Sequence, residues 1–132
     1  MIQERPENPY KTRRGNPEMH IQAMCVKWLW NERPQTRRLF FHVENEVNVA
    51  GNNAVLGAIR RAQGIVKGVS DCILLMQRGG YGGLMVEFKT AVGYQSEAQK
   101  EWQKLVEKQG YKYMVVRSFE EFQAIIDNYL NL

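Results

Sequence analysis

The chain has 132 residues and carries 18 lysines and arginines against 14 aspartates and glutamates, a formal net charge of +4 at pH 7. This length corresponds to one domain, and 44% hydrophobic with 24% charged residues is typical of a water-soluble globular protein. No apolar run approaches the roughly 20 residues of a membrane-spanning helix, so we expect a cytoplasmic protein without a membrane partner. Cys25 and Cys72 belong to no CxxC or Cys/His pattern, which argues against a disulfide framework and a structural zinc site.

Positive charge is concentrated in the first half of the chain. Residues 1–67 contain 11 lysines and arginines and 6 aspartates and glutamates, whereas residues 68–132 contain 7 and 8. Such a surplus suits a polyanion such as DNA or RNA, because each neutralised phosphate releases counterions. A basic surface that only keeps the protein in solution would have the same composition, so charge alone leaves both interpretations open.

The first half of the chain predicts an arm, a helix and a strand. Residues 1–16 are polar and contain two prolines, which indicates a flexible N-terminal arm before a single domain over residues 17–132. A helix is expected to begin at Pro17 and to end before Pro34, with an apolar face that includes Ile21, Cys25 and Leu29. A strand is predicted over residues 39–43, and residues 45–68 form a long connection with a short helix near 55–62.

The second half alternates strands and helices. Residues 72–76 and 84–89 are predicted strands, joined by a glycine-rich turn in an antiparallel hairpin. Ser96 and Gln99 form a capping box that begins a helix, and a strand over residues 113–116 follows it, parallel to the strand at 84–89. A second capping box, Ser118 with Glu121, begins a terminal helix. The order predicts an α/β fold, a small mixed sheet flanked by helices. The inner face of the helix after Ser96 is predicted to consist of Ala98, Trp102, Leu105 and Val106.

Two carboxylates and a lysine are predicted to meet at one end of the hairpin. Side chains at positions i and i+2 of a strand share a face, so Glu87 and Lys89 point together while Phe88 turns into the core. Asp71 begins the neighbouring antiparallel strand and therefore lies near the end of the strand at 84–89. Paired carboxylates suit Mg²⁺, the Phe88 carbonyl is a further candidate ligand, and Lys89 is placed to act on a water molecule.

Each of these residues also has an ordinary structural interpretation. A Glu-x-Lys pair on a strand is commonly a solvent-facing ion pair, and an aspartate after Gly-Val-Ser is commonly a turn residue. Trp28, Trp30 and Trp102 are interpreted as core or dimer contacts in preference to base-stacking platforms, although Trp30 lies off the main apolar face. His20 and His42 are interpreted as surface or structural residues. It is the combination of Asp71, Glu87 and Lys89 in a basic protein that favours phosphodiester hydrolysis.

The sequence resembles the VRR-NUC domain (virus-type replication-repair nuclease), a branch of the PD-(D/E)xK nucleases, over about residues 17–130. The resemblance implies a restriction-endonuclease-like fold. It also departs from the family pattern at one position, because Ser70 stands where a proline is expected before the aspartate. The matching residues are Glu18 and Gln22, Asn45-Glu46, Lys67-Gly68-Val69-Ser70-Asp71, Val86-Glu87-Phe88-Lys89, and Ser96 to Gln99 with Trp102 and Gly110.

The resemblance implies a role for each of five side chains. Asp71 and Glu87 would ligate the metal, Lys89 would be the catalytic lysine, and Gln99 would support the site from its helix. Glu18 would be an acidic residue contributed by the first helix, although a first-turn acid stabilised by the helix dipole is an equally good interpretation. The resemblance further implies branched DNA such as a Holliday junction as substrate, a homodimer, and a phage or bacterial origin.

These inferences give one hypothesis and several alternatives. The hypothesis is a structure-selective DNA endonuclease that depends on Mg²⁺, with Mn²⁺ as a substitute cation and with the loop at residues 90–95 beside the site. A non-catalytic DNA-junction-binding module of the same fold is the main alternative, and an RNA-processing nuclease shares the same site. A sequence-specific restriction enzyme is disfavoured, because no recognition domain fits in this length. The residues expected to bind DNA phosphates are Arg37, Arg38, Arg60, Arg61 and Lys67.

Overall fold

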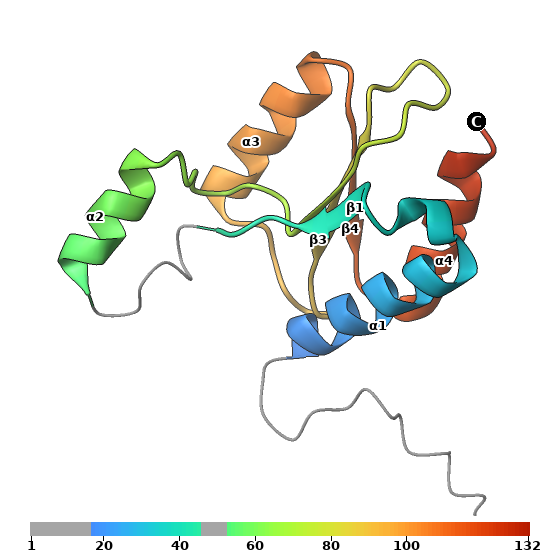
Figure 1. Cartoon of the computed structure of the whole chain (residues 1–132), viewed down its shortest axis with the longest axis horizontal. Coiled ribbons are helices and arrows are strands. Elements are labelled where there is room, and N and C mark those ends of the chain that lie inside the picture. The colour runs from blue at the N-terminus through green and yellow to red at the C-terminus, as the bar shows by residue number, and fades with distance from the viewer. Residues whose placement is uncertain (1–16, 46–52) are drawn as a thin grey trace, which may run out of the picture.

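The computed structural model describes residues 17–45 and 53–132, and it contains four α-helices and four strands in those ranges (Figure 1). The predicted N-terminal arm and Glu46 lie outside the described residues. The elements are α1 (Pro17–Glu32), a short 3₁₀ helix η1 (Pro34–Thr36), β1 (Phe40–His42), α2 (Ala54–Ala62), β2 (Cys72–Leu74), β3 (Leu84–Phe88), α3 (Glu97–Lys108), β4 (Lys112–Val116) and α4 (Phe119–Leu130).

The four strands form one mixed sheet in the order β1-β2-β3-β4. The β1–β2 and β2–β3 pairs are antiparallel, whereas β4 runs parallel to β3 after the crossover through α3. The predicted α/β fold with a small mixed sheet is confirmed, including the hairpin at residues 72–88 and the parallel last strand. In the residues that the structure describes, no helix combines the length and apolarity needed to cross a membrane.

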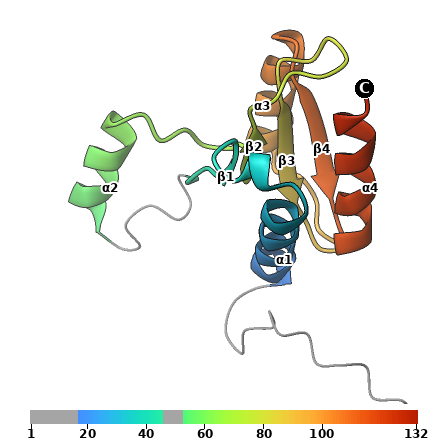
Figure 2. The same ribbon diagram turned by 45° about the vertical axis from the view of Figure 1, so that its right-hand side comes forward.

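The main hydrophobic core lies between the sheet and the α1–α4 pair, and α3 covers the opposite face (Figure 2). On the α1–α4 side, Cys25 and Leu29 from α1 and Phe122 and Ile126 from α4 are fully buried, together with apolar side chains of the strands. Phe88 is 1% exposed and its ring lies 6.0 Å from that of Phe122. The expectation that Phe88 turns into the core is therefore confirmed. Since alternate residues face opposite sides, Glu87 faces the α3 side.

Gly68 lets the segment that leads into β2 lie directly against α3. Its φ of +82° is in the left-handed region, and a Cβ built there would lie 2.6 Å from the backbone carbonyl carbon and oxygen of Ala98. Only glycine fits both the conformation and the space. The close approach sets where Asp71, three residues later, enters the sheet.

Helix α2 projects away from the sheet and its helices, at the end of the long connection (Figures 1 and 2). Asn53 caps it by accepting a hydrogen bond from the Leu56 N–H at 2.9 Å. Val55 and Ile59, one turn apart, are 73% and 52% exposed. The short helix predicted near residues 55–62 is confirmed, but its apolar side chains are not part of the core.

Two details of the sequence-based expectation are wrong. Leu105, predicted on the inner face of α3, is 62% exposed. In the described part of the chain α3 packs mainly against β4, which leaves the flank on which Leu105 lies uncovered. At the start of α4, Ser118 accepts a hydrogen bond from the Glu121 N–H, but the reciprocal bond of a capping box is shown only at α3.

Candidate active site

The structure places Asp71 beside the end of β3. Cys72 pairs with Val86 in the antiparallel ladder, so the preceding Asp71 lies opposite Glu87. The Oδ2 of Asp71 accepts a hydrogen bond from the backbone N–H of Phe88 at 2.6 Å. One oxygen of this carboxylate is thus fixed by the neighbouring strand at the position where β2 begins and β3 ends.

Glu87 is fully buried at 0% exposure, which excludes the interpretation of this residue as part of a solvent-facing ion pair. Its Oε1 accepts a hydrogen bond from the hydroxyl of Tyr113 on β4 at 2.8 Å. Its Oε2 is buried and has no hydrogen-bond partner among the described residues. A buried acceptor without a partner costs about 1–3 kcal/mol and is unusual in a native protein.

The pKa values of both carboxyl groups are raised, chiefly because burial disfavours their charged forms. For Asp71, the Phe88 N–H bond and the electrostatic influence of His42 and Lys89 lower the pKa, while Glu18 raises it. For Glu87, the Tyr113 hydroxyl and Lys89 lower the pKa, while Asp71 raises it. Lys89 therefore acts electrostatically on both carboxylates, and Glu18 acts on Asp71.

The donor set at this position fits a hard divalent cation. In the described ranges no group of three or more His, Cys, Asp and Glu side chains is close enough to hold a metal ion. Mg²⁺ does not require such a group, because it is usually held by one or two carboxylates and keeps several waters. The unpartnered Glu87 Oε2 is an acceptor that a cation would satisfy, beside the carboxylate of Asp71.

The segment that leads into α3 approaches the site at Gln95, whereas the side chain of the predicted Gln99 serves the helix cap. The Oε1 of Gln99 accepts a hydrogen bond from the Ser96 N–H at 2.8 Å, so this side chain completes the capping box of α3. Gln95 lies near the side chains of Glu87 and Tyr113 and lowers the pKa of each, and its Nε2 donates a hydrogen bond to Oε1 of Gln103 at 2.9 Å. Gln95 and Tyr113 were not predicted as site residues.

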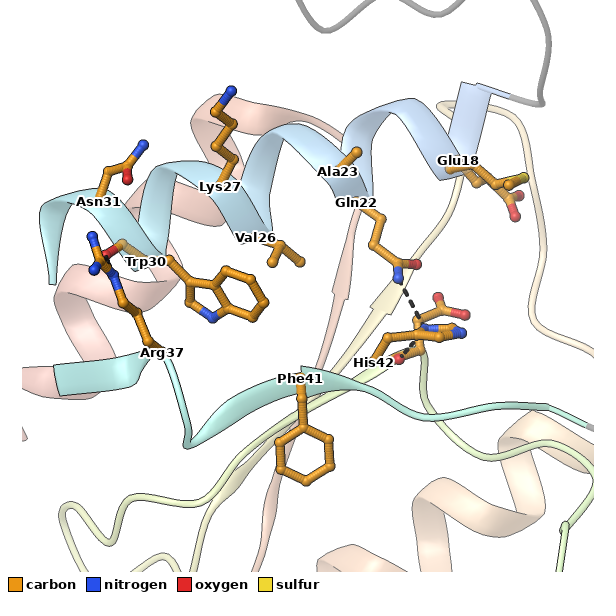
Figure 3. A pocket seen from close by; sticks show the side chains of 12 residues that line it. Glu18, Gln22, Ala23, Val26, Lys27, Trp30, Asn31, Arg37, Phe41 and His42 are labelled. Carbon is orange, nitrogen blue, oxygen red and sulfur yellow. Dashed lines mark hydrogen bonds between the residues drawn. The ribbon is translucent and has the colours of Figure 1, made fainter. Parts of the chain in front are cut away.

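His42 joins β1 to the site. Its Nδ1 lies 2.8 Å from the backbone oxygen of Asp71 and 2.9 Å from Nε2 of Gln22 on α1 (Figure 3). The sequence places His42 at the end of a strand but gives no sign that β1 ends beside Asp71. The contact of His42 with Asp71 therefore follows from the pairing of β1 with β2 and not from the local sequence.

The loop that follows β3 is held by Arg117. One guanidinium nitrogen of Arg117 donates to the backbone oxygens of Thr90 and Gly93, each at 2.7 Å. Tyr94, in the same loop, is 88% exposed. The loop predicted at residues 90–95 therefore lies directly after Lys89 and presents an aromatic side chain to solvent.

A cavity of about 910 Å³ runs along α1 and is lined at one end by Asp71 (Figure 3). Glu18, Gln22, His42 and Asp71 line it where it meets the site, and Arg37 lines it elsewhere. The structure thus brings Glu18 of α1 to the same cavity as Asp71.

The predicted phosphate-binding residues do not form one cluster. Arg37 and Arg38 follow η1 and are exposed, and Lys67 is exposed ahead of Gly68. Arg60 forms an ion pair with Glu44, and the guanidinium of Arg61 lies against Gly57. Arg60 and Arg61 belong to the projecting α2, apart from the residues that line the cavity.

Comparison with known proteins identifies a family and a solved structure to which the chain is similar. A family model described as "VRR-NUC domain" matches residues 16–120. A solved chain titled "VRR_NUC domain protein" is similar over 90% of this chain and 92% of that chain, with a TM-score of 0.74 and 24% sequence identity. This structural similarity shows that the two chains share a fold. No curated protein matches.

Proposed function

This chain belongs to the VRR-NUC domain family, which implies a nuclease of the PD-(D/E)xK type, and we propose that it is a Mg²⁺-dependent DNA endonuclease selective for branched DNA. One observation carries the proposal. Asp71 and Glu87 come from adjacent strands, lie beside Lys89, and each has one oxygen fixed by a hydrogen bond, while the other oxygen of Glu87 has no partner in the described chain. This arrangement supports a cation-dependent hydrolase.

In the proposed mechanism, the Asp71 and Glu87 carboxylates and the Phe88 carbonyl would hold the cation. When bound, the cation would supply Lewis acidity and offset the negative charge of the phosphodiester. Tyr113 and the Phe88 N–H orient the two carboxylates before substrate arrives. Lys89 positions the attacking water and stabilises the added negative charge of the transition state. Glu18, which also lines the cavity, completes the acidic side of the site.

The partners in this proposal are DNA and a second copy of the chain. Arg37, Arg38 and Lys67 are exposed cations that would contact phosphates without reading bases. The exposed Val55 and Ile59 of α2 support a homodimer, because apolar side chains on a projecting helix are typical of a surface that another chain covers. A two-fold dimer also matches the symmetry of a four-way junction.

The main alternative is a non-catalytic DNA-junction-binding module of the same fold. The buried, hydrogen-bonded carboxylates disfavour it, since negative charge beside a phosphate weakens binding unless a cation lies between them. An RNA-processing nuclease would use the same site, and competition between DNA and RNA substrates separates it from the proposal.

The proposal is tested by cleavage of a four-way junction, a flap, a splayed arm and a linear duplex, with Mg²⁺, with Mn²⁺ and with EDTA. Cleavage is expected with Mg²⁺ or Mn²⁺, preferentially of branched substrates. Asp71→Asn keeps an acceptor for the Phe88 N–H but removes the charge, so we expect cleavage to be lost while DNA binding persists. Asp127→Asn, an exposed carboxylate on α4, is the matched control.

Two results would contradict this proposal. Wild-type protein that binds junctions but cleaves no polynucleotide with either cation would establish the binding module instead. Equal cleavage by wild type and Asp71→Asn would show that the site lies elsewhere.

A further inference from the structure

The cavity along α1 has chemically different ends (Figure 3). Asp71 and Glu18 line one end, where it joins the proposed catalytic carboxylates. Lys27 and Arg37 line it farther along α1, toward the helix C-terminus. The groove therefore changes from acidic to basic over the length of about two turns of α1.

Between the two ends the wall of the groove is apolar and contains one fixed aromatic ring. Ala23, Val26 and Trp30 lie three and four residues apart on α1 and line the groove, whereas Cys25 and Leu29 on another face of the helix are buried in the core. The indole N–H of Trp30 donates to the backbone oxygen of Phe40 at 2.9 Å, which holds the ring against β1. Arg37 is fixed beside it, because its Nε donates to the Trp30 backbone oxygen at 3.0 Å.

We propose that this groove binds an unpaired nucleotide of the DNA strand being cut, with its base against Trp30 and its outer phosphate at Lys27 and Arg37. The proposal rests on the function proposed above, because it takes the carboxylates as the position of the reacting phosphate. Along the groove, acidic groups are followed by an aromatic ring and then by basic groups. This order matches the order along a DNA strand, in which the scissile phosphate is followed by a base and then by the next phosphate.

The volume and the chemistry of the groove both favour an unpaired nucleotide. About 910 Å³ is within the range of sites that enclose one small-molecule ligand. Bases inside a duplex are stacked on their neighbours, so only an unpaired base offers a free face to an aromatic ring. An apolar segment of a second copy would fit the wall formed by Ala23, Val26 and Trp30, but it would give no reason for two cations beside it.

The test measures binding of fluorescein-labelled DNA by anisotropy in EDTA, so that cleavage does not contribute. A fork with unpaired arms is compared with a blunt duplex of equal length. Trp30→Leu and Trp30→Phe both remove the indole N–H, but only Trp30→Leu removes the aromatic face. We expect Trp30→Leu to weaken fork binding about tenfold and duplex binding less than twofold, whereas Trp30→Phe retains most of the fork affinity.

A second pair of variants tests the basic end of the groove. Lys27→Gln should reduce the slope of log affinity against log salt for the fork by about 0.7, the value for one phosphate contact with a single strand. Lys104→Gln removes the same charge from the exposed surface of α3 and should leave the slope unchanged. Ala23→Phe adds a side chain inside the groove at an exposed helix position and should weaken fork binding without disturbing the core.

The outcomes separate this inference from the proposed function. Wild-type protein that neither binds nor cleaves any DNA would overturn both. If wild type cleaves DNA, but Trp30→Leu, Trp30→Phe and Ala23→Phe affect fork and duplex equally, the groove inference is wrong and the nuclease proposal stands. A fall in molecular mass by light scattering for Ala23→Phe would show that a second copy occupies the groove, which also overturns the inference.

Discussion

At the residue scale, the two carboxylates of the site are held by different kinds of donor. Asp71 is fixed by a backbone N–H of the neighbouring strand, a donor that no substitution at Phe88 other than proline removes. Glu87 is fixed by the side chain of Tyr113, which a single substitution can remove. The position of Glu87 is therefore the more sensitive of the two to mutation around the site.

Tyr113→Phe removes this hydroxyl and leaves the ring in place. We expect the free energy of unfolding to fall by about 1–2 kcal/mol, and the Mg²⁺ concentration for half-maximal cleavage to rise severalfold because Glu87 loses its orienting donor. Tyr129→Phe is the matched control, since its buried hydroxyl donates to the Met76 backbone oxygen at 2.6 Å, in the main core. The control should lose similar stability with an unchanged Mg²⁺ requirement. A similar increase of the Mg²⁺ requirement in both variants would contradict a positioning role for Tyr113.

Lys89→Ala tests the lysine that acts on both carboxylates. We expect kcat to fall about a hundredfold or more, since the lost ammonium is the group proposed to position water and to stabilise charge in the transition state, while DNA affinity changes little. Single-turnover cleavage and anisotropy measure the two quantities. Lys108→Ala on α3 controls for the loss of one positive charge, and a variant whose affinity falls as much as its kcat would assign Lys89 to DNA binding instead.

The sequence could predict that Asp71 and Glu87 lie close together, because strand alternation and one hairpin are enough to place them. It could not predict Tyr113, Gln95 or His42. The approach of Tyr113 to Glu87 depends on the β3–β4 register, and that of His42 on the β1–β2 pairing, which residues 45–68 separate in sequence. Gln99 was expected at the site from the family resemblance, but the hydrogen bond to Ser96 uses its side-chain oxygen for the helix cap.

At the element scale, the contact between the segment before β2 and α3 depends on Gly68. Gly68→Ala should lower the free energy of unfolding by about 2–4 kcal/mol, because the left-handed φ is strained for alanine and the new Cβ meets the Ala98 backbone. Gly64→Ala is a close control: its φ is +102°, but no atom lies within 4 Å of a Cβ built there.

Urea denaturation of the two variants measures the difference. Gly64→Ala should lose only the conformational part, about 1 kcal/mol. An equal loss in both variants would show that the contact with α3 contributes nothing.

The element boundaries followed from local signals wherever those signals were strong. Helix α1 begins at Pro17 and ends before Pro34, and the capping box of Ser96 with Gln99 begins α3, as predicted. The wrong prediction that Leu105 lies on the inner face of α3 has a different cause. Helical spacing shows which side chains share a face, but the width of the covered stripe depends on how many neighbouring elements pack there, and that is a property of the assembled sheet.

At the scale of the whole molecule, α2 is the element least connected to the rest of the fold (Figure 2). The double variant Val55→Ser/Ile59→Ser should leave the stability of a monomer nearly unchanged, because both side chains are exposed. We expect it to shift the mass measured by light scattering from dimer toward monomer. Leu105→Ser, which changes a similarly exposed apolar residue on α3, should not shift the mass. Equal masses for all three proteins would contradict a dimer contact at α2.

The hydrogen bonds of Arg117 would affect how the protein binds a substrate. By bridging the carbonyls of Thr90 and Gly93, it orders the loop that carries Tyr94 while the protein is free. A loop ordered in advance loses little chain entropy on docking, so Tyr94 would engage a partner as a rigid contact and association would require no slow rearrangement there. Breaking that bridge is expected to make complex formation slower and less favourable.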